Sequence, residues 1–150
     1  MVFKIIANVY IGDRNEINNP AIKKYDIIDT ICISSNKYNQ FSYQLSFGKS
    51  DQEFYQTLDQ CLILIQKAKI ENNNILICCD NGSTETLPII IYYLIICLNM
   101  NISDAENYVN NCFINNDKMI DNKYVKKLHS KYIVKRIFEN YNPDCSNIIY

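Results

Sequence analysis

Residues 75–100 read ILICCDNGSTETLPIIIYYLIICLNM, and this stretch decides the fold. Residues 75–77 are a short apolar run rich in β-branched isoleucine that follows three asparagines, a pattern typical of a buried strand. Residues 87–98 are almost wholly apolar and long enough for a buried helix of about three to four turns. A strand, a short loop and a helix in this order direct free backbone N–H groups and the positive end of the helix dipole at the loop. The segment therefore predicts an anion site.

The composition indicates one globular domain over residues 1–150. The chain has 150 residues, of which 48% are hydrophobic and 21% are charged, enough to bury a real core. Its formal net charge is −1, so no basic field favours nucleic acid or an acidic membrane. The longest apolar run is too short to cross a bilayer as a helix. We therefore expect no binding to nucleic acid or to a membrane.

Seven cysteines are scattered along the chain, most of them inside apolar runs. No secretory signal precedes them, so we interpret them as buried free thiols of a reducing compartment. The sequence contains no C-x-x-C pair, and its one histidine, His129, falls in a stretch that we predict to be a lysine-rich helix. We therefore predict neither a metal site nor a cofactor.

Strands and helices are predicted to alternate along the rest of the chain. Period-two and β-branched patterns predict four further strands, at residues 3–6, 9–11, 27–33 and 41–47, with a turn at Gly12 and Asp13. Helical spacing predicts a short helix opened by Pro20, one that Asp51 caps, one opened by a capping box over residues 103–106, and one over residues 121–141. We interpret the basic face of the last helix as solvated. Such alternation indicates an α/β fold with a sheet covered on both faces.

The loop resembles the phosphate-binding loop of the cysteine-dependent protein phosphatases, in particular the dual-specificity class. That family reads His-Cys-x-x-Gly-x-x-Arg, and the same frame covers residues 78–85 here. Cys79 takes the nucleophile position and Gly82 the glycine position. Cys78 stands where the family has His, and Glu85 stands where it has Arg.

The opening sequence IIANVYIG, residues 5–12, also resembles the first strand of that family, and the resemblance extends over roughly residues 3–141. It implies a central, mostly parallel sheet of four to five strands flanked by helices. It also assigns seven residues to the phosphate loop: Cys79, Asp80, Asn81, Gly82, Ser83, Thr84 and Glu85.

The family's reaction needs a thiolate that attacks phosphorus, a guanidinium that holds the phosphate, and an Asp that protonates the leaving oxygen. Cys79 is the vestigial nucleophile in this comparison. Gly48 and Lys49 occupy the acid region, which leaves Asp51 either as a displaced acid or as a helix cap.

Glu85 decides the functional interpretation. A carboxylate about 4 Å from a phosphate costs about 4 kcal/mol per opposing charge at an effective dielectric constant near 20. In the first turn of a helix the same carboxylate is worth about 0.3–1 kcal/mol through the helix dipole, and Glu85 can serve as the loop's own anion. Phosphate binding is therefore expected to be weak or absent.

The sequence thus predicts a pseudophosphatase that binds a protein partner, itself or both, as a scaffold rather than a catalyst. The alternative is a Cys79-dependent phosphatase with residual activity or altered specificity. Heavy use of Asn, Ile, Lys and Tyr suggests an AT-rich genome such as that of a virus or an intracellular parasite. The expected location is the cytoplasm, that is, the host cytoplasm or the virion if the protein is viral.

Overall fold

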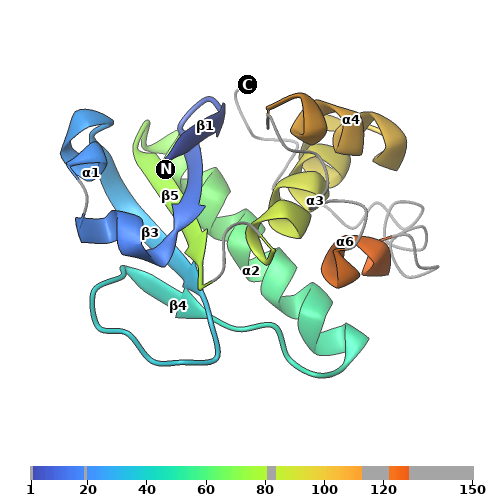
Figure 1. Ribbon diagram of the computed structural model, residues 1–150. Helices are drawn as coiled ribbons and strands as arrows, with labels where there is room; N and C mark the ends of the chain where they lie inside the picture. Colours follow the sequence, from blue (N-terminus) through green and yellow to red (C-terminus); the bar gives the residue numbers. More distant parts are fainter. Residues whose placement is uncertain (1, 19, 81–83, 113–121, 129–150) are drawn as a thin grey trace.

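The computed structural model describes residues 2–18, 20–80, 84–112 and 122–128 of the chain. Its core is a five-stranded sheet with the order β1-β2-β5-β3-β4 (Figure 1). β1 pairs antiparallel with β2, and the other neighbouring strands are parallel. The predicted mostly parallel sheet is thereby confirmed. The strands are β1 (Phe3–Ile6), β2 (Val9–Asp13), β3 (Ile27–Ile33), β4 (Tyr43–Leu45) and β5 (Asn74–Cys79).

Helices cover both faces of this sheet, as predicted. Figure 1 shows the long helix α2 with α3, α4 and α6 on one side, and the short α1 on the other. Within the helix predicted over residues 121–141, the structure describes residues 122–128, where α6 begins after its N-cap Asn122 and ends at its C-cap Leu128. The predicted helix is therefore interrupted at Leu128, and residues 121 and 129–141 lie outside the described residues. The helical segments are η1 (Arg14–Asn18, a 3-10 helix), α1 (Ala21–Lys24), α2 (Asp51–Ile70), α3 (Thr86–Leu98), α4 (Ile102–Cys112) and α6 (Lys123–Lys127).

The two faces of the sheet bury very different amounts of apolar surface. Because side chains alternate along a strand, Ile75 and Ile77 of β5 join the large core that contains α2 and α3. Leu76 points the other way and packs with Val2 and Tyr10 in a small cluster beneath α1. The large core therefore carries most of the hydrophobic stabilisation.

Helix α3 is the centre of the large core. Its residues from Thr86 through Cys97 are all buried, because the sheet, α2 and α4 surround it. The helix ends at Asn99, whose φ of 55° is left-handed, and the Met100 N–H closes the last turn by donating to the Leu94 carbonyl oxygen at 3.1 Å. The sequence-based prediction of a buried helix after the loop is confirmed.

Three local predictions are wrong by a few residues. Gly12 and Asp13 continue β2 rather than forming a turn, because they stay in parallel register with Cys78 and Cys79 of β5. The cap of α2 is Ser50, whose hydroxyl accepts the Glu53 N–H at 3.1 Å, and Asp51 is the first helical residue.

The cap of α4 also differs from the predicted capping box over residues 103–106. Asn101 accepts the Asp104 N–H at 2.8 Å and donates to the Asp104 carboxylate at 3.0 Å, so the capping pair is Asn101 and Asp104.

Most of the cysteines are buried thiols, as predicted. Cys32, Cys61, Cys78 and Cys79 are buried and outside disulfides, and Cys112 is a half-buried thiol. Burial raises the pKa of Cys61 to about 12, which keeps that thiol protonated and inert. Cys97 is disulfide-bonded, so the prediction is wrong for this residue. Within the described part of the chain, no helix has the length and apolarity needed to span a membrane.

Candidate functional site

The candidate site begins where β5 ends in the middle of the sheet. Cys79 is the last residue of β5, in register with Asp13 of β2 and Ile33 of β3, and its exposed fraction is 0%. The chain then enters α3 at Thr86. The predicted strand and helix are therefore confirmed, with Cys79 at the end of a central strand. The loop residues Asn81, Gly82 and Ser83 lie outside the described residues.

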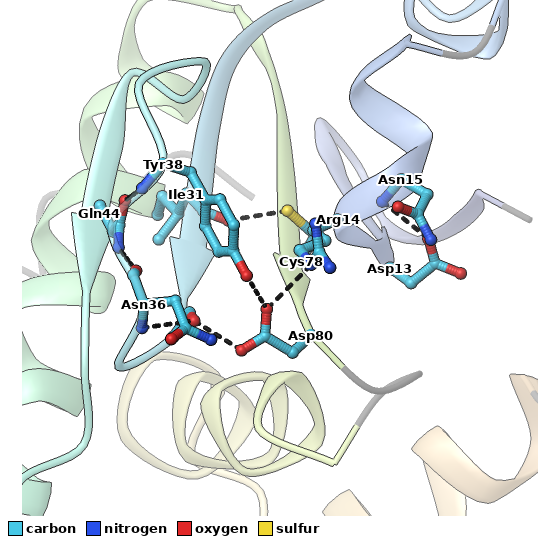
Figure 2. A network of polar contacts seen from close by, with 10 residues as sticks. Asp13, Arg14, Asn15, Ile31, Asn36, Tyr38, Gln44, Cys78 and Asp80 are labelled. Carbon is cyan, nitrogen blue, oxygen red and sulfur yellow. Dashed lines mark hydrogen bonds and ion pairs between the residues drawn. The ribbon is translucent and has the colours of Figure 1, made fainter.

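Asp80 is the centre of a polar network at this edge of the sheet (Figure 2). The Ser34 hydroxyl donates to Asp80 Oδ2 at 2.5 Å, and the Tyr38 hydroxyl donates to Oδ1 at 2.9 Å. Arg14 Nε forms an ion pair with Oδ1 at 3.0 Å. Arg14 follows β2, Ser34 follows β3 and Asp80 follows β5, so the carboxylate comes from the middle strand and its partners come from both sides.

These contacts keep Asp80 ionised. They hold the pKa of its carboxyl group below the ordinary value, first through the Ser34 hydrogen bond and further through Tyr38 and Arg14, against the opposing effect of burial. The sequence placed Asp80 in the loop but did not predict its partners. Arg14, Ser34 and Tyr38 each follow or flank a strand, and only the order of the strands brings them together.

Cys78, at the family's His position, points away from Cys79 to the opposite face of the sheet. Its Sγ donates to the Ile31 carbonyl oxygen at 3.5 Å, and it is in register with Cys32. The hydrogen bond with Cys32, and then burial, raise the pKa of Cys78. This thiol is therefore a neutral donor to the sheet, and it brings no positive charge to Cys79.

The far end of the loop is held by a residue that sequence reasoning missed. The Asn122 side chain donates to the Thr84 carbonyl oxygen at 2.8 Å and accepts the N–H groups of Tyr124 and Val125 at 3.0 and 3.1 Å. Asn122 is buried and caps α6, so α6 is anchored to the loop. An Asn directly before a helical pattern was the available signal.

Glu85 stands at the start of α3, as predicted, but it does not cap the helix. It is the N-cap residue with helical φ and ψ of −88° and −21°, and its side chain makes no capping hydrogen bond. Its Oε2 atom is buried and has no hydrogen-bond partner among the described residues. A buried carboxylate oxygen without a donor is costly, which marks this position as unusual.

The acid region offers no carboxylate at the expected place. A Cβ at Gly48 would overlap the Glu53 side chain, so an Asp at position 48 would require Glu53 to move. Asp51 begins α2 with its side chain 68% exposed, and it lies 3.8 Å from Lys127 Nζ. Its assignment as a displaced acid stays a prediction.

Metal ligands do not gather in the described part of the chain. Its His, Cys, Asp and Glu side chains form no group of three or more that could hold an ion. Near the loop, Asp80 accepts a hydrogen bond from Ser34, and the Thr84 carbonyl oxygen accepts one from Asn122.

No protein-family model matches the sequence, and the search of curated proteins finds no match. Solved structures do match. A leucine rich repeat and phosphatase domain containing protein from Entamoeba histolytica has a TM-score of 0.71 and 16% identity, over 92% of this chain and 93% of that one. The human tyrosine phosphatase-like serine/threonine/tyrosine-interacting protein has a TM-score of 0.69 and 18% identity, over 91% and 97%.

A mouse putative dual specificity phosphatase, crystallised with zinc tungstate, has a TM-score of 0.69 and 14% identity, over 95% of this chain and 92% of that one. At identities this low, the likeness concerns the fold. It spans nearly the full length of each chain and includes the five-stranded sheet flanked by helices. The chain therefore has the α/β fold of the dual-specificity phosphatases.

Proposed function

We propose that this chain is a pseudophosphatase, a phosphatase-fold protein that binds another protein and does not hydrolyse phosphate esters. One observation carries the proposal. Glu85 stands where the fold's enzymes need a guanidinium, and its Oε2 atom is buried with no hydrogen-bond donor among the described residues. A bound phosphate would place a second negative charge beside this carboxylate, where Coulomb repulsion opposes binding.

Three further observations support inactivity. Cys79 has an exposed fraction of 0%, whereas a nucleophile must reach its substrate. Cys78 supplies a neutral thiol on the opposite face instead of an imidazole. Glu53 occupies the space that a side chain at Gly48 would need. Each of these removes a part of the family's chemistry.

A protein that keeps the phosphatase fold but does not catalyse the reaction can still act by binding other molecules. Among the structural neighbours, the human protein is named as tyrosine phosphatase-like and as an interacting protein, which agrees with this class. The partner is proposed to be a protein or a second copy of this chain. Among the described residues, five cysteines lie outside disulfides, which favours a cytoplasmic location, in a host cell or virion if the AT-rich composition reflects a virus. The disulfide at Cys97 argues against it.

The catalytic part is tested by hydrolysis of an aryl phosphate. Wild type and Cys79→Ser should give the same background rate, because no step depends on the thiol. A rate in wild type that Cys79→Ser abolishes would establish the alternative, a residual Cys79-dependent phosphatase. Circular dichroism of both proteins shows that the comparison is made on folded chains.

The binding part is tested by affinity purification from the native cell with both proteins as bait. A scaffold should retain the same partner with wild type and with Cys79→Ser, in equal amounts. A partner enriched only by Cys79→Ser is a trapped substrate and contradicts the proposal. A phosphatase treatment of the lysate then separates phosphorylation-dependent partners from the others.

A further inference from the structure

A small set of side-chain donors surrounds Asp80. Two hydroxyl groups, from Ser34 and Tyr38, and the guanidinium of Arg14 converge on its carboxylate. These side chains follow β2 and β3, which flank β5 on both sides. We call Arg14, Ser34 and Tyr38 the edge cradle.

Each member of the edge cradle is oriented by a second contact that does not involve Asp80. The Ser34 hydroxyl accepts the Asn36 N–H at 3.0 Å, which directs its proton toward Asp80. The Tyr38 N–H donates to the Gln44 side chain at 2.7 Å, and the Gln44 amide donates back to the Asn36 carbonyl oxygen (Figure 2). Ser34 and Tyr38 are therefore each held by a contact other than the one to Asp80.

Arg14 is held in the same way. Its guanidinium carbon lies 4.7 Å from the centre of the Tyr38 ring, so the cation stacks on the aromatic face. The preceding residue, Asp13, accepts the Asn15 N–H at 2.9 Å, which fixes the start of η1. The position of the guanidinium is thus determined by its own surroundings.

Arg14 meets Asp80 through its Nε atom, which is buried and lies 3.0 Å from Asp80 Oδ1. A guanidinium with two nearby hydroxyl donors is the chemistry that recognises carboxylates and phosphates. The side chains of Arg14 and Asp80 are 41% and 26% exposed, so solvent reaches the cradle.

We propose that the edge cradle is an oxyanion-binding site that the chain fills with its own Asp80, and that an external oxyanion binds there once this carboxylate is removed. The site needs neither Cys79 nor Glu85, so it goes beyond the proposed function. The carboxyl edge of parallel strands is also where α/β folds bind their ligands. The contrasting interpretation is a structural ion-pair network that tightens the loop and binds nothing.

The test is Asp80→Ala, with sodium phosphate and sodium acetate as separate probes, measured by calorimetry at neutral pH. At least one probe should bind at least about tenfold more tightly than to wild type, because the vacated donors are charge-assisted. Binding of phosphate alone would indicate that the site selects a tetrahedral anion. Binding of both phosphate and acetate would indicate that the site also accepts carboxylates. A folded Asp80→Ala protein that binds neither probe more tightly would overturn the proposal.

Two double variants assign the bound anion to the cradle. Arg14→Gln added to Asp80→Ala should abolish the gain in affinity. Lys24→Gln is the matched control, because Lys24 Nζ also stacks on a tyrosine, 5.4 Å from the Tyr25 ring, but lies outside the cradle. Binding that survives Arg14→Gln would place the anion at the loop instead and refute the assignment.

If Asp80→Ala does not fold, the proposal can be tested in variants that keep Asp80. The pKa of Asp80, followed by NMR, should rise toward its ordinary value in Arg14→Gln and in Tyr38→Phe, because both remove a group that favours the charged form. An unchanged pKa in both variants would show that the cradle does not act on this carboxylate, and the proposal would fail.

Discussion

Two carboxylates lie at the two ends of the same loop, and they differ in their hydrogen-bond partners. Asp80, at the start, receives two hydroxyl hydrogen bonds and an ion pair. Glu85, at the end, has a buried oxygen with no hydrogen-bond partner among the described residues. Both residues sit in one short motif, so their identity alone does not distinguish them.

This difference indicates that side-chain contacts hold one end of the loop and a backbone contact holds the other. At the start, the loop is held by its own acidic side chain, which interacts with groups from two neighbouring strands. At the end, it is held through its backbone, because Asn122 donates to the Thr84 carbonyl oxygen while the Glu85 side chain contributes no cap. Asp80 is therefore expected to stabilise the fold, and Glu85 to act mainly on ligands.

The largest effect is expected from Glu85→Arg on oxyanion affinity. The substitution removes the repulsion and adds two charge-assisted hydrogen bonds, each worth about 1.5–3 kcal/mol, at a helix N-terminus that already favours anions. Vanadate should therefore bind this variant at least about 100-fold more tightly than wild type, measured by calorimetry or thermal shift. Hydrolysis should recover only partly, because general acid catalysis is typically worth about 10²–10⁴-fold and the acid region has no carboxylate in place.

Glu85→Gln is the control for this prediction, since it removes the charge without adding a guanidinium. Equal vanadate affinity in wild type and Glu85→Arg would mean that the Glu85 carboxylate does not face the bound anion. The protein would then be better described as a binder of phosphorylated residues.

Asn122→Ala should produce the largest loss of stability among the loop contacts, about 1–3 kcal/mol in the free energy of unfolding. It removes a helix cap, typically worth about 0.5–2 kcal/mol, and leaves the Thr84 carbonyl oxygen without this donor. Urea denaturation measures the loss. Asn122→Asp keeps the cap and loses only the donated bond, so it should be intermediate, and a neutral Asn122→Ala would show that α6 is not anchored to the loop.

Asp80→Ala should cost about 1–2 kcal/mol at neutral pH, because the partners of Asp80 are only partly buried and water replaces some of the lost interaction. This loss should depend on pH. The folded-state pKa of Asp80 is lowered, so its contribution is present above the pKa of an unfolded aspartate and disappears as the pH falls through the lower folded value.

The free energies of unfolding of wild type and Asp80→Ala should accordingly converge toward acid pH, with wild type the more stable at neutral pH. Urea titrations at several pH values provide the measurement, and Asp51→Ala is a matched control at an exposed carboxylate. A difference between wild type and Asp80→Ala that does not change with pH would contradict the assigned contacts.

The smallest effect is expected from Glu85→Ala on stability, less than about 1 kcal/mol. The lost interaction with the helix dipole, about 0.3–1 kcal/mol, is offset by removing a buried oxygen that lacks a donor. Thermal unfolding of wild type, Glu85→Ala and Asp80→Ala under the same conditions measures the two losses of stability. A loss larger than that of Asp80→Ala would reverse the roles assigned to the two ends of the loop.

The sequence by itself determined the elements around the loop. The run that becomes α3 is so apolar that only a fully buried helix satisfies it, and β5 follows from a short isoleucine-rich run with a polar stop before it. These signals are local, so the position of Cys79 at the end of a strand and of Glu85 at the start of a helix could be read from residue order.

Only the tertiary structure decided what each loop residue contacts. Ser34 and Tyr38 are 46 and 42 residues from Asp80, and Asn122 is 38 residues from Thr84. Hydrogen bonds between residues so far apart depend on the strand order β2-β5-β3 and on where α6 begins, and no local pattern encodes either. The physical reason is that periodicity reports burial along one element, whereas a polar contact requires two elements to be placed within about 3 Å of each other.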